Sequence, residues 1–193
     1  MKRNILIFQL LSLLVILGAC STVPSIGLIA AEAEITSDPH KVGSTEIELN
    51  NGEKEYIPPT SLYYTFSVKN EGNRKIGKEN AEEGLRVKIE PHEKLLTASE
   101  EVIGLNIFDK NTYDEKGMGY GYGYSYVNML EPDDTSEFII YYDLGYDADS
   151  SDVRPAPNRQ QLDLLISNAL EATLIVTVGN EEIARFDLSK EAK

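Results

Sequence analysis

The most informative reactive side chain in this sequence is a single cysteine close to its start. Cys20 is the only thiol among 193 residues, which excludes an intramolecular disulfide, a Cys-based zinc site and a paired-cysteine redox centre. A thiol can still act as a nucleophile. Gly18 and Ala19, the two residues before Cys20, are small, as is typical of the position where an export signal is cut.

Residues 1–19 have the order of features that marks an export signal. Two basic residues, Lys2 and Arg3, precede a mostly apolar run over residues 5–17. An uncleaved membrane helix is the competing interpretation, but the run up to residue 19 is shorter than the roughly 20 residues that a span needs. Under either interpretation, we expect the rest of the chain to lie outside the cytoplasm.

The stretch Leu17-Gly18-Ala19-Cys20 resembles the lipobox of bacterial lipoproteins. That resemblance implies cleavage after Ala19, a new N-terminus at Cys20 and a diacylglycerol thioether on its sulfur. Two acyl chains anchor a protein stably to a membrane, whereas a single chain, such as one palmitate, gives only marginal membrane binding. The resemblance therefore implies a protein held on the extracytoplasmic face of the cell membrane, with the membrane as a partner through the lipid on Cys20.

The charge balance limits the remaining partners. The chain has 18 basic and 32 acidic residues, a net charge of −14. The leader contains two of those basic residues and none of the acidic ones, so the mature chain would carry −16. Such a surface repels phosphate backbones, and we expect no nucleic-acid binding. Solubility is the simplest role for this acidity.

A tyrosine–glycine run is the best candidate for a binding surface. Tyr120, Tyr122, Tyr124 and Tyr126 alternate with small residues, so in an extended chain all four rings lie on one face. Such a ladder could stack on sugar rings or on the apolar surface of a protein partner. The glycines would let a backbone or a ligand approach the opposite face. Packing on the protein's own core and a flexible loop are the alternatives.

An acidic loop is a weaker candidate, for calcium. Its carboxylates could gather a hard cation, with Asp147 and Asp149 at the first alternate positions of a calcium loop. The sixth position is not glycine and the twelfth is Asn158, so a solvated acidic loop is the main alternative. The four candidate ligands are Asp143, Asp147, Asp149 and Asp152.

The sequence contains no motif that indicates catalysis. It lacks the nucleophile elbow, the zinc-protease pair, the Ser-x-x-Lys motif and a glycine-rich phosphate loop. We therefore predict that the protein is not an enzyme, and we predict no cofactor. A cell-wall polymer hydrolase that uses paired carboxylates stays an alternative, because such a pair can occur in any acidic sandwich.

The mature chain divides into a tether and one domain. Residues 20–31 are small and apolar, and we expect them to link the lipid to the domain. Residues 32–193 show no repeat or composition break, which predicts one domain large enough to bury a real core.

That domain has the patterning of a mainly β protein. Several short segments, separated by turn residues, alternate in polarity or are rich in aromatic and β-branched residues. The final two flank a Gly179-Asn180 turn, which is typical of a tight hairpin. One short helix is predicted near residues 158–170, capped by Asn158. The predicted strands lie at residues 47–49, 62–68, 85–89, 102–108, 138–144, 173–178 and 181–188.

Two of these strands resemble those of immunoglobulin-like domains in bacterial surface lipoproteins. Val68, Asn70 and Gly72 follow a strand-and-turn pattern of those domains, and Leu130-Glu131-Pro132-Asp133-Asp134 precedes a strand like one that they carry later. Asp133 stands where glycine is common in the family. The resemblance implies an antiparallel immunoglobulin-like β-sandwich with no catalytic residues to carry over.

These observations together predict a lipid-anchored, non-catalytic binding or accessory protein outside the cytoplasm. Its ligand would be a protein or a glycan. The alternatives are the hydrolase named above and an inhibitor or immunity-type lipoprotein that blocks an exported partner.

Overall fold

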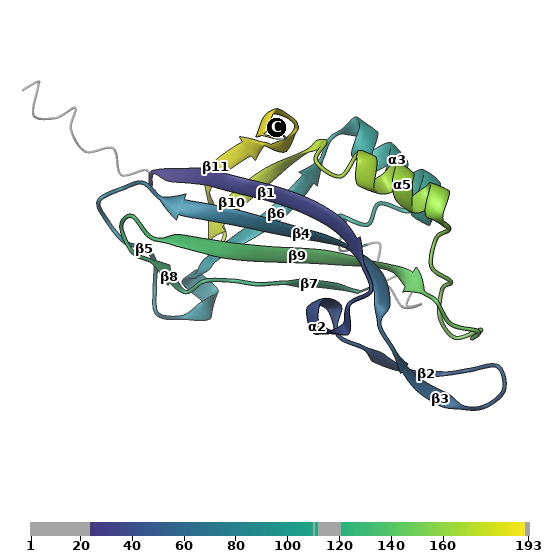
Figure 1. Ribbon diagram of the computed structural model, residues 1–193. Helices are drawn as coiled ribbons and strands as arrows, with labels where there is room; N and C mark the ends of the chain where they lie inside the picture. The colour runs from purple at the N-terminus through teal and green to yellow at the C-terminus, as the bar shows by residue number, and fades with distance from the viewer. Residues whose placement is uncertain (1–23, 110, 112–120, 192–193) are drawn as a thin grey trace, which may run out of the picture.

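The computed structural model describes residues 24–109, 111 and 121–191 of the chain. The fold is mainly β, and every pairing in its two larger sheets is antiparallel. Figure 1 shows the larger sheet as one layer, with the smaller sheet and two helices on one side of it.

The larger sheet has the strand order β1-β4-β9-β7. The period-two alternation along β4 explains its position, because Leu62, Tyr64, Phe66 and Val68 are all fully buried on one face. Phe138 of β9 pairs with Phe66 in register and is also fully buried. The strands are Ile26–Thr36 (β1), Pro59–Asn70 (β4), Tyr122–Tyr124 (β7) and Thr135–Tyr146 (β9).

The smaller sheet has the order β11-β10-β6, and it contains the predicted C-terminal hairpin. Gly179 adopts φ +55° in the two-residue turn, a conformation that glycine reaches without strain. The predicted alternation of Leu85, Val87 and Ile89 is confirmed, since all three are buried against the larger sheet. The strands are Leu85–Pro91 (β6), Ala172–Val178 (β10) and Glu181–Asp187 (β11).

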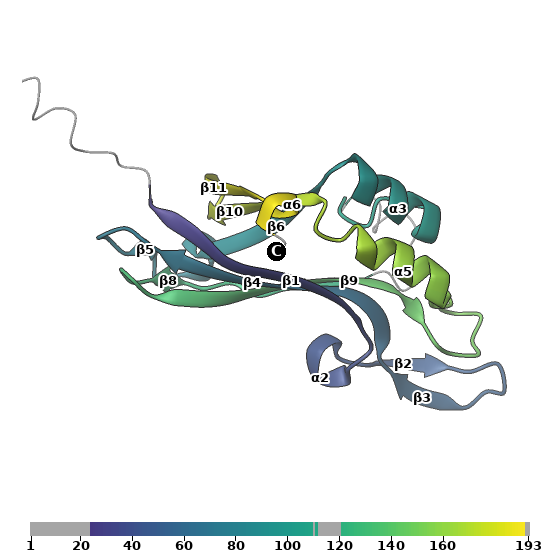
Figure 2. The same ribbon diagram turned by 45° about the horizontal axis from the view of Figure 1, so that its top comes forward.

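Two helices extend this second layer beyond the end of the smaller sheet (Figure 2). The helix predicted near residues 158–170 is confirmed as α5, and Asn158 is its N-cap. The Asn158 side chain accepts from the Gln161 N–H at 3.1 Å, while Gln161 accepts from the Asn158 N–H at 3.0 Å, a capping box. Within the described residues the helices are Pro39–Val42 (α2), Glu93–Ile103 (α3), Arg159–Ser167 (α5) and Leu188–Glu191 (α6).

No helix in the described part of the chain combines the length and the apolar run needed to span a bilayer.

The remaining elements are short. The β2–β3 hairpin extends from the body at the opposite end from the start of β1 (Figure 1). These elements are Thr45–Glu48 (β2), Lys54–Ile57 (β3), Ile76–Gly77 (β5), Ala81–Glu83 (a 3-10 turn) and Met129–Leu130 (β8).

A buried asparagine joins the two turns that follow β4 and precede β9. The Asn70 side-chain amide donates to the carbonyls of Arg74 at 2.8 Å and Leu130 at 3.1 Å, and its oxygen accepts from the Gly72 N–H at 3.0 Å. Its backbone N–H donates to the carbonyl of Asp134 at 3.0 Å. Asn70 therefore links the two segments that the sequence identified as similar to one family.

Three predictions about the elements are corrected by the structure. The predicted tether over residues 20–31 is too long, because residues from Ile26 onward form β1 and pair with β4. The predicted strand at residues 102–108 is wrong, because Val102 and Ile103 end α3. The fold also contains more than the single helix near residues 158–170 that the sequence predicted.

Candidate functional site

Two of the predicted site residues lie outside the described residues. These are Cys20, the predicted lipid attachment point, and Tyr120, the first member of the predicted tyrosine ladder. The other three tyrosines of the ladder are described and are partly exposed: Tyr122 by 38%, Tyr124 by 46% and Tyr126 by 49%.

Tyr122 and Tyr124 are placed together by β7, an edge strand of the larger sheet. They pair in register with Tyr142 and Ile140 of β9, so their side chains lie on the sheet face that packs against the second layer. Their rings stack with centroids 6.2 Å apart and planes 13° apart. Tyr126 lies beyond the end of β7.

The glycines of the run serve the protein's own packing. A Cβ on Gly123 would lie 2.3 Å from the Tyr141 ring, and one on Gly121 would lie 2.3 Å from a carboxylate oxygen of Asp143. The sequence predicted room for a backbone or a ligand on this face, but the groups that approach it are side chains of the neighbouring strand β9.

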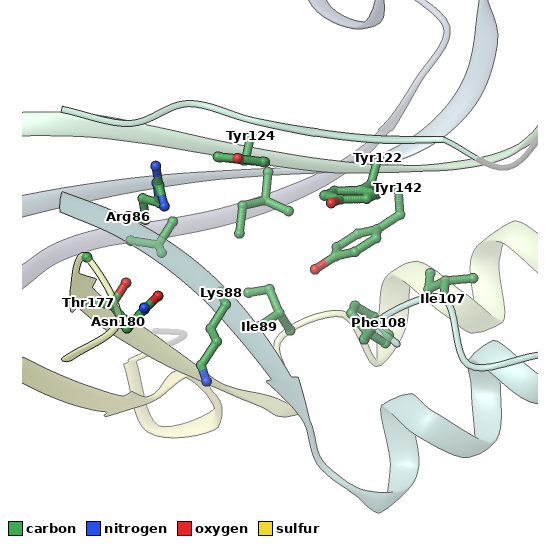
Figure 3. A pocket seen from close by; sticks show the side chains of 13 residues that line it. Arg86, Lys88, Ile89, Ile107, Phe108, Tyr122, Tyr124, Tyr142, Thr177 and Asn180 are labelled. Carbon is green, nitrogen blue, oxygen red and sulfur yellow. The ribbon is translucent and has the colours of Figure 1, made fainter. Parts of the chain in front are cut away.

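A cleft lies beside these tyrosines, between the edge strands β6 and β7 of the two sheets. Its volume is about 360 Å³. Figure 3 shows the side chains that surround this inter-sheet cleft. They belong to Arg86, Val87, Lys88, Ile89, Ile107, Phe108, Tyr122, Tyr124, Ile140, Tyr142, Thr177, Gly179 and Asn180.

The floor of the inter-sheet cleft is aromatic and uncharged. The Phe108 ring meets the Tyr142 ring edge-on, with centroids 4.8 Å apart and planes at 67°. Burial raises the pKa of the Tyr142 hydroxyl well above its usual range, and the nearby Tyr122 adds to this. Tyr142 therefore stays protonated at physiological pH, and the floor presents apolar surface with one hydroxyl.

The rim of the cleft carries the opposite charge to the protein as a whole. Among the described lining residues, Arg86 and Lys88 are charged, and both are cationic. In Figure 3 the Arg86 side chain extends toward Tyr124, and the Lys88 ammonium points away from the tyrosines. Thr177 and Asn180 complete the polar side of the rim. A cleft with an aromatic floor and a basic rim suits a ligand that is apolar and acidic.

The predicted calcium ligands are not brought together. Asp143 lies in β9 and is nearly buried, and it accepts from the Ser61 hydroxyl at 2.7 Å. Asp149 accepts from the Asn50 side-chain amide at 2.7 Å, at the β2–β3 hairpin, while Asp147 and Asp152 are exposed. Among the described residues, no group of three or more carboxylate, histidine or thiol side chains is arranged to hold a metal. The geometry gives a calcium site no support.

Burial raises the pKa of the Asp143 carboxyl, and the Ser61 hydrogen bond partly opposes that shift.

On the outer face of the larger sheet, a second hollow of about 390 Å³ is lined mostly by polar and charged side chains. Lys41 pairs with Glu34 there and lies 5.3 Å from the centroid of the Tyr63 ring.

Sequence reasoning missed the half of the cleft that comes from β6 and from the segment after α3. Phe108 lies in the run that was predicted as a strand. Arg86 and Lys88 are the polar positions of a strand whose alternation was recognised, so their pattern indicated only an exposed face. Their position opposite β7 depends on how the two sheets pack.

Comparison of the chain with protein-family models, with curated proteins and with solved structures finds no match.

Proposed function

We propose that this protein is a lipid-anchored, non-catalytic binding protein on the extracytoplasmic face of the cell membrane, and that the inter-sheet cleft is its ligand site. The observation that carries the binding role is the cleft itself, in which two stacked tyrosines and a basic rim border an aromatic floor. The Leu17-Gly18-Ala19-Cys20 stretch supports the anchor.

The proposal includes an immunoglobulin-like architecture for the two larger sheets. If β1, β4, β6, β7, β9, β10 and β11 are lettered A to G in chain order, the larger sheet has the order A-B-E-D and the smaller one G-F-C. That order matches the constant-type immunoglobulin arrangement. The helices α3 and α5 would then be insertions, after strand C and after strand E. The agreement of strand order supports the resemblance that the sequence suggested.

The anchor is tested by metabolic labelling with a fatty-acid probe. Cys20→Ala should abolish the label and leave a longer precursor with residues 1–19 still attached, whereas Ser21→Ala should be labelled like the wild type. A wild-type protein that carries a free thiol at Cys20 would contradict the anchor.

The binding role is tested by capture of a ligand from cell-surface extracts on the immobilised protein. The double change Tyr122→Ala and Tyr124→Ala removes the stacked pair from the cleft and should abolish capture. Tyr56→Ala is the matched control, because Tyr56 is 73% exposed and lies on the distant β2–β3 hairpin. Equal capture by both variants would contradict a role for the cleft.

A further inference from the structure

We propose that the inter-sheet cleft takes an extended acidic peptide segment as an added strand along the outer edge of β6, which pairs with no described strand beyond Leu85. This inference rests on the proposed binding function and names the class of its ligand. The occupant is a segment whose apolar residues enter the cleft and alternate with acidic residues on the other face.

The hydrogen bonds around β6 define which of its backbone groups face the cleft. Gly84 accepts from the Gly179 N–H at 3.1 Å and His92 donates to the Glu171 carbonyl at 2.9 Å, so even-numbered residues of this segment face β10. Leu85 exchanges two bonds with Val127 on the other side, at 2.7 and 3.1 Å. Because backbone direction alternates, the N–H and C=O groups of Val87 and Ile89 face away from β10.

Those groups form an edge that another strand can use. Leu85 has the only pairing on this side of β6 among the described residues, in its bridge to Val127. Val87 and Ile89 follow it into the cleft, and no strand of the described residues pairs with their two outward N–H and two outward C=O groups. In variable-type immunoglobulin domains, additional strands lengthen the sheet at the edge that corresponds to β6 under the lettering above. A peptide would occupy a position that this architecture permits.

The opposite wall of the cleft supplies the apolar contacts. Tyr122 and Tyr124 extend from β7 toward the second layer, and Tyr142 and Phe108 form the floor. Side chains of an added strand in register with Val87 and Ile89 would point to this aromatic surface, because cross-strand neighbours share a face. Apolar residues fit those positions.

Charge complementarity determines the alternate residues of the peptide. A side chain in register with Lys88 would share the face of this exposed cation, which points away from the tyrosines (Figure 3), and an acidic partner is favoured there. The protein as a whole is acidic, at −14. Glu90, the carboxylate nearest along this face of β6, is paired with Arg185 at 3.0 Å. At physiological ionic strength the screening length is about 8 Å, so Lys88 outweighs the carboxylates that lie farther away.

The test uses the full-length protein in detergent and the peptide EVEWEVE with both ends blocked. The protein contains no tryptophan, so the emission of the peptide tryptophan reports its binding alone. We expect saturable binding with a blue-shifted emission. N-methylation of the two valines and the tryptophan, whose amides would face β6, should weaken binding by about tenfold or more, because several backbone hydrogen bonds are lost.

A charge exchange tests the register without disturbing the fold, since Lys88 is exposed. Lys88→Glu should weaken binding of EVEWEVE by about fivefold or more and should strengthen binding of KVKWKVK. Lys54→Glu makes the same change in charge on the β2–β3 hairpin and should leave both affinities at the wild-type value.

The inference is overturned if EVEWEVE fails to bind at millimolar concentration, or if neither N-methylation nor Lys88→Glu changes its affinity. Binding of chitohexaose in the cleft, without binding of the peptide, would also overturn it. If tyrosine-dependent capture from surface extracts persists in those cases, the binding function stands and only the peptide assignment fails.

Discussion

Asp133 occupies a backbone conformation that few residues other than glycine adopt. It follows Pro132 in the turn before β9 and adopts φ +63°, the one positive φ among the described non-glycine residues. Glycine reaches this left-handed region without strain, and aspartate and asparagine tolerate it better than other residues. Asp133 therefore adopts a turn conformation that a glycine at this position would also reach.

We expect Asp133→Val to lower the free energy of unfolding by about 1–2 kcal/mol, because a β-branched side chain is strained at this φ. Asp133→Asn should stay within about 0.5 kcal/mol of the wild type, since asparagine also tolerates this conformation and the ion pair that is lost, with Lys69 at 3.5 Å, is exposed and weak. Urea unfolding measures both. Equal stability of the two variants would show that the turn does not require a left-handed residue.

Asp143 is the residue whose charge state should affect stability. Burial raises the pKa of its carboxyl in the folded state, so the folded protein holds this proton more tightly than the unfolded chain does. The contribution of Asp143 to stability therefore falls as pH rises from the unfolded pKa, near 3.9, through the higher folded pKa.

Asp143→Asn should accordingly be at least as stable as the wild type at pH 7, and the difference should shrink as the pH falls toward 4. The asparagine oxygen can still accept from the Ser61 hydroxyl. Thermal unfolding across this pH range measures the effect, with Ser61→Ala as the variant that removes the hydrogen bond instead. A wild type that gains stability over Asp143→Asn as the pH rises would contradict the assigned direction.

Among the helices and strands, the alternation of apolar and polar residues along the sequence predicts strands well and helix ends poorly. The buried face of β4 and the hairpin of β10 and β11 follow directly from period-two patterns. The helix α3 was missed because its last residues begin the apolar run at residues 102–108, which was predicted as a strand. Gly104 ends that helix at φ +80°, with its N–H donated to the Glu100 carbonyl at 2.8 Å.

The outer edge of β6 makes a prediction about amide hydrogen exchange. The amides of Val87 and Ile89 face the cleft and should exchange quickly, whereas those of Lys88 and Glu90 face β10 and should be protected. Residue-resolved exchange followed by NMR measures this alternation. Uniform protection along β6 would indicate that its outer edge is already paired. When EVEWEVE is added, exchange should slow at Val87 and Ile89 only.

At the scale of the whole molecule, the early start of β1 limits how far the domain can be from an anchored lipid. Five residues separate Cys20 from Ile26. At about 3.5 Å per residue, β1 would begin within roughly 20 Å of the lipid-bearing sulfur. Glu71 donates its N–H to the Ser25 carbonyl at 2.9 Å, so the turn after β4 lies beside this start.

We therefore expect the turn after β4 to face the membrane and the β2–β3 hairpin to point away from it (Figure 1). A fluorophore on Asn73→Cys should be quenched by spin-labelled headgroups when the lipidated protein is reconstituted in vesicles. The same fluorophore on Asn51→Cys, at the hairpin tip, is the control and should not be quenched. Equal quenching at both positions would contradict this orientation.

Local features could be predicted from the sequence alone: the alternation of the main strands, the capped helix at Asn158 and the common face of Tyr122 and Tyr124. The export signal with its single cysteine stays a prediction. Each of these depends on residues that are close along the chain, whose spacing a sequence displays. The position of the cleft could not be predicted in this way. Its walls, β6 and β7, come from different sheets, and their approach depends on packing between residues far apart in the chain.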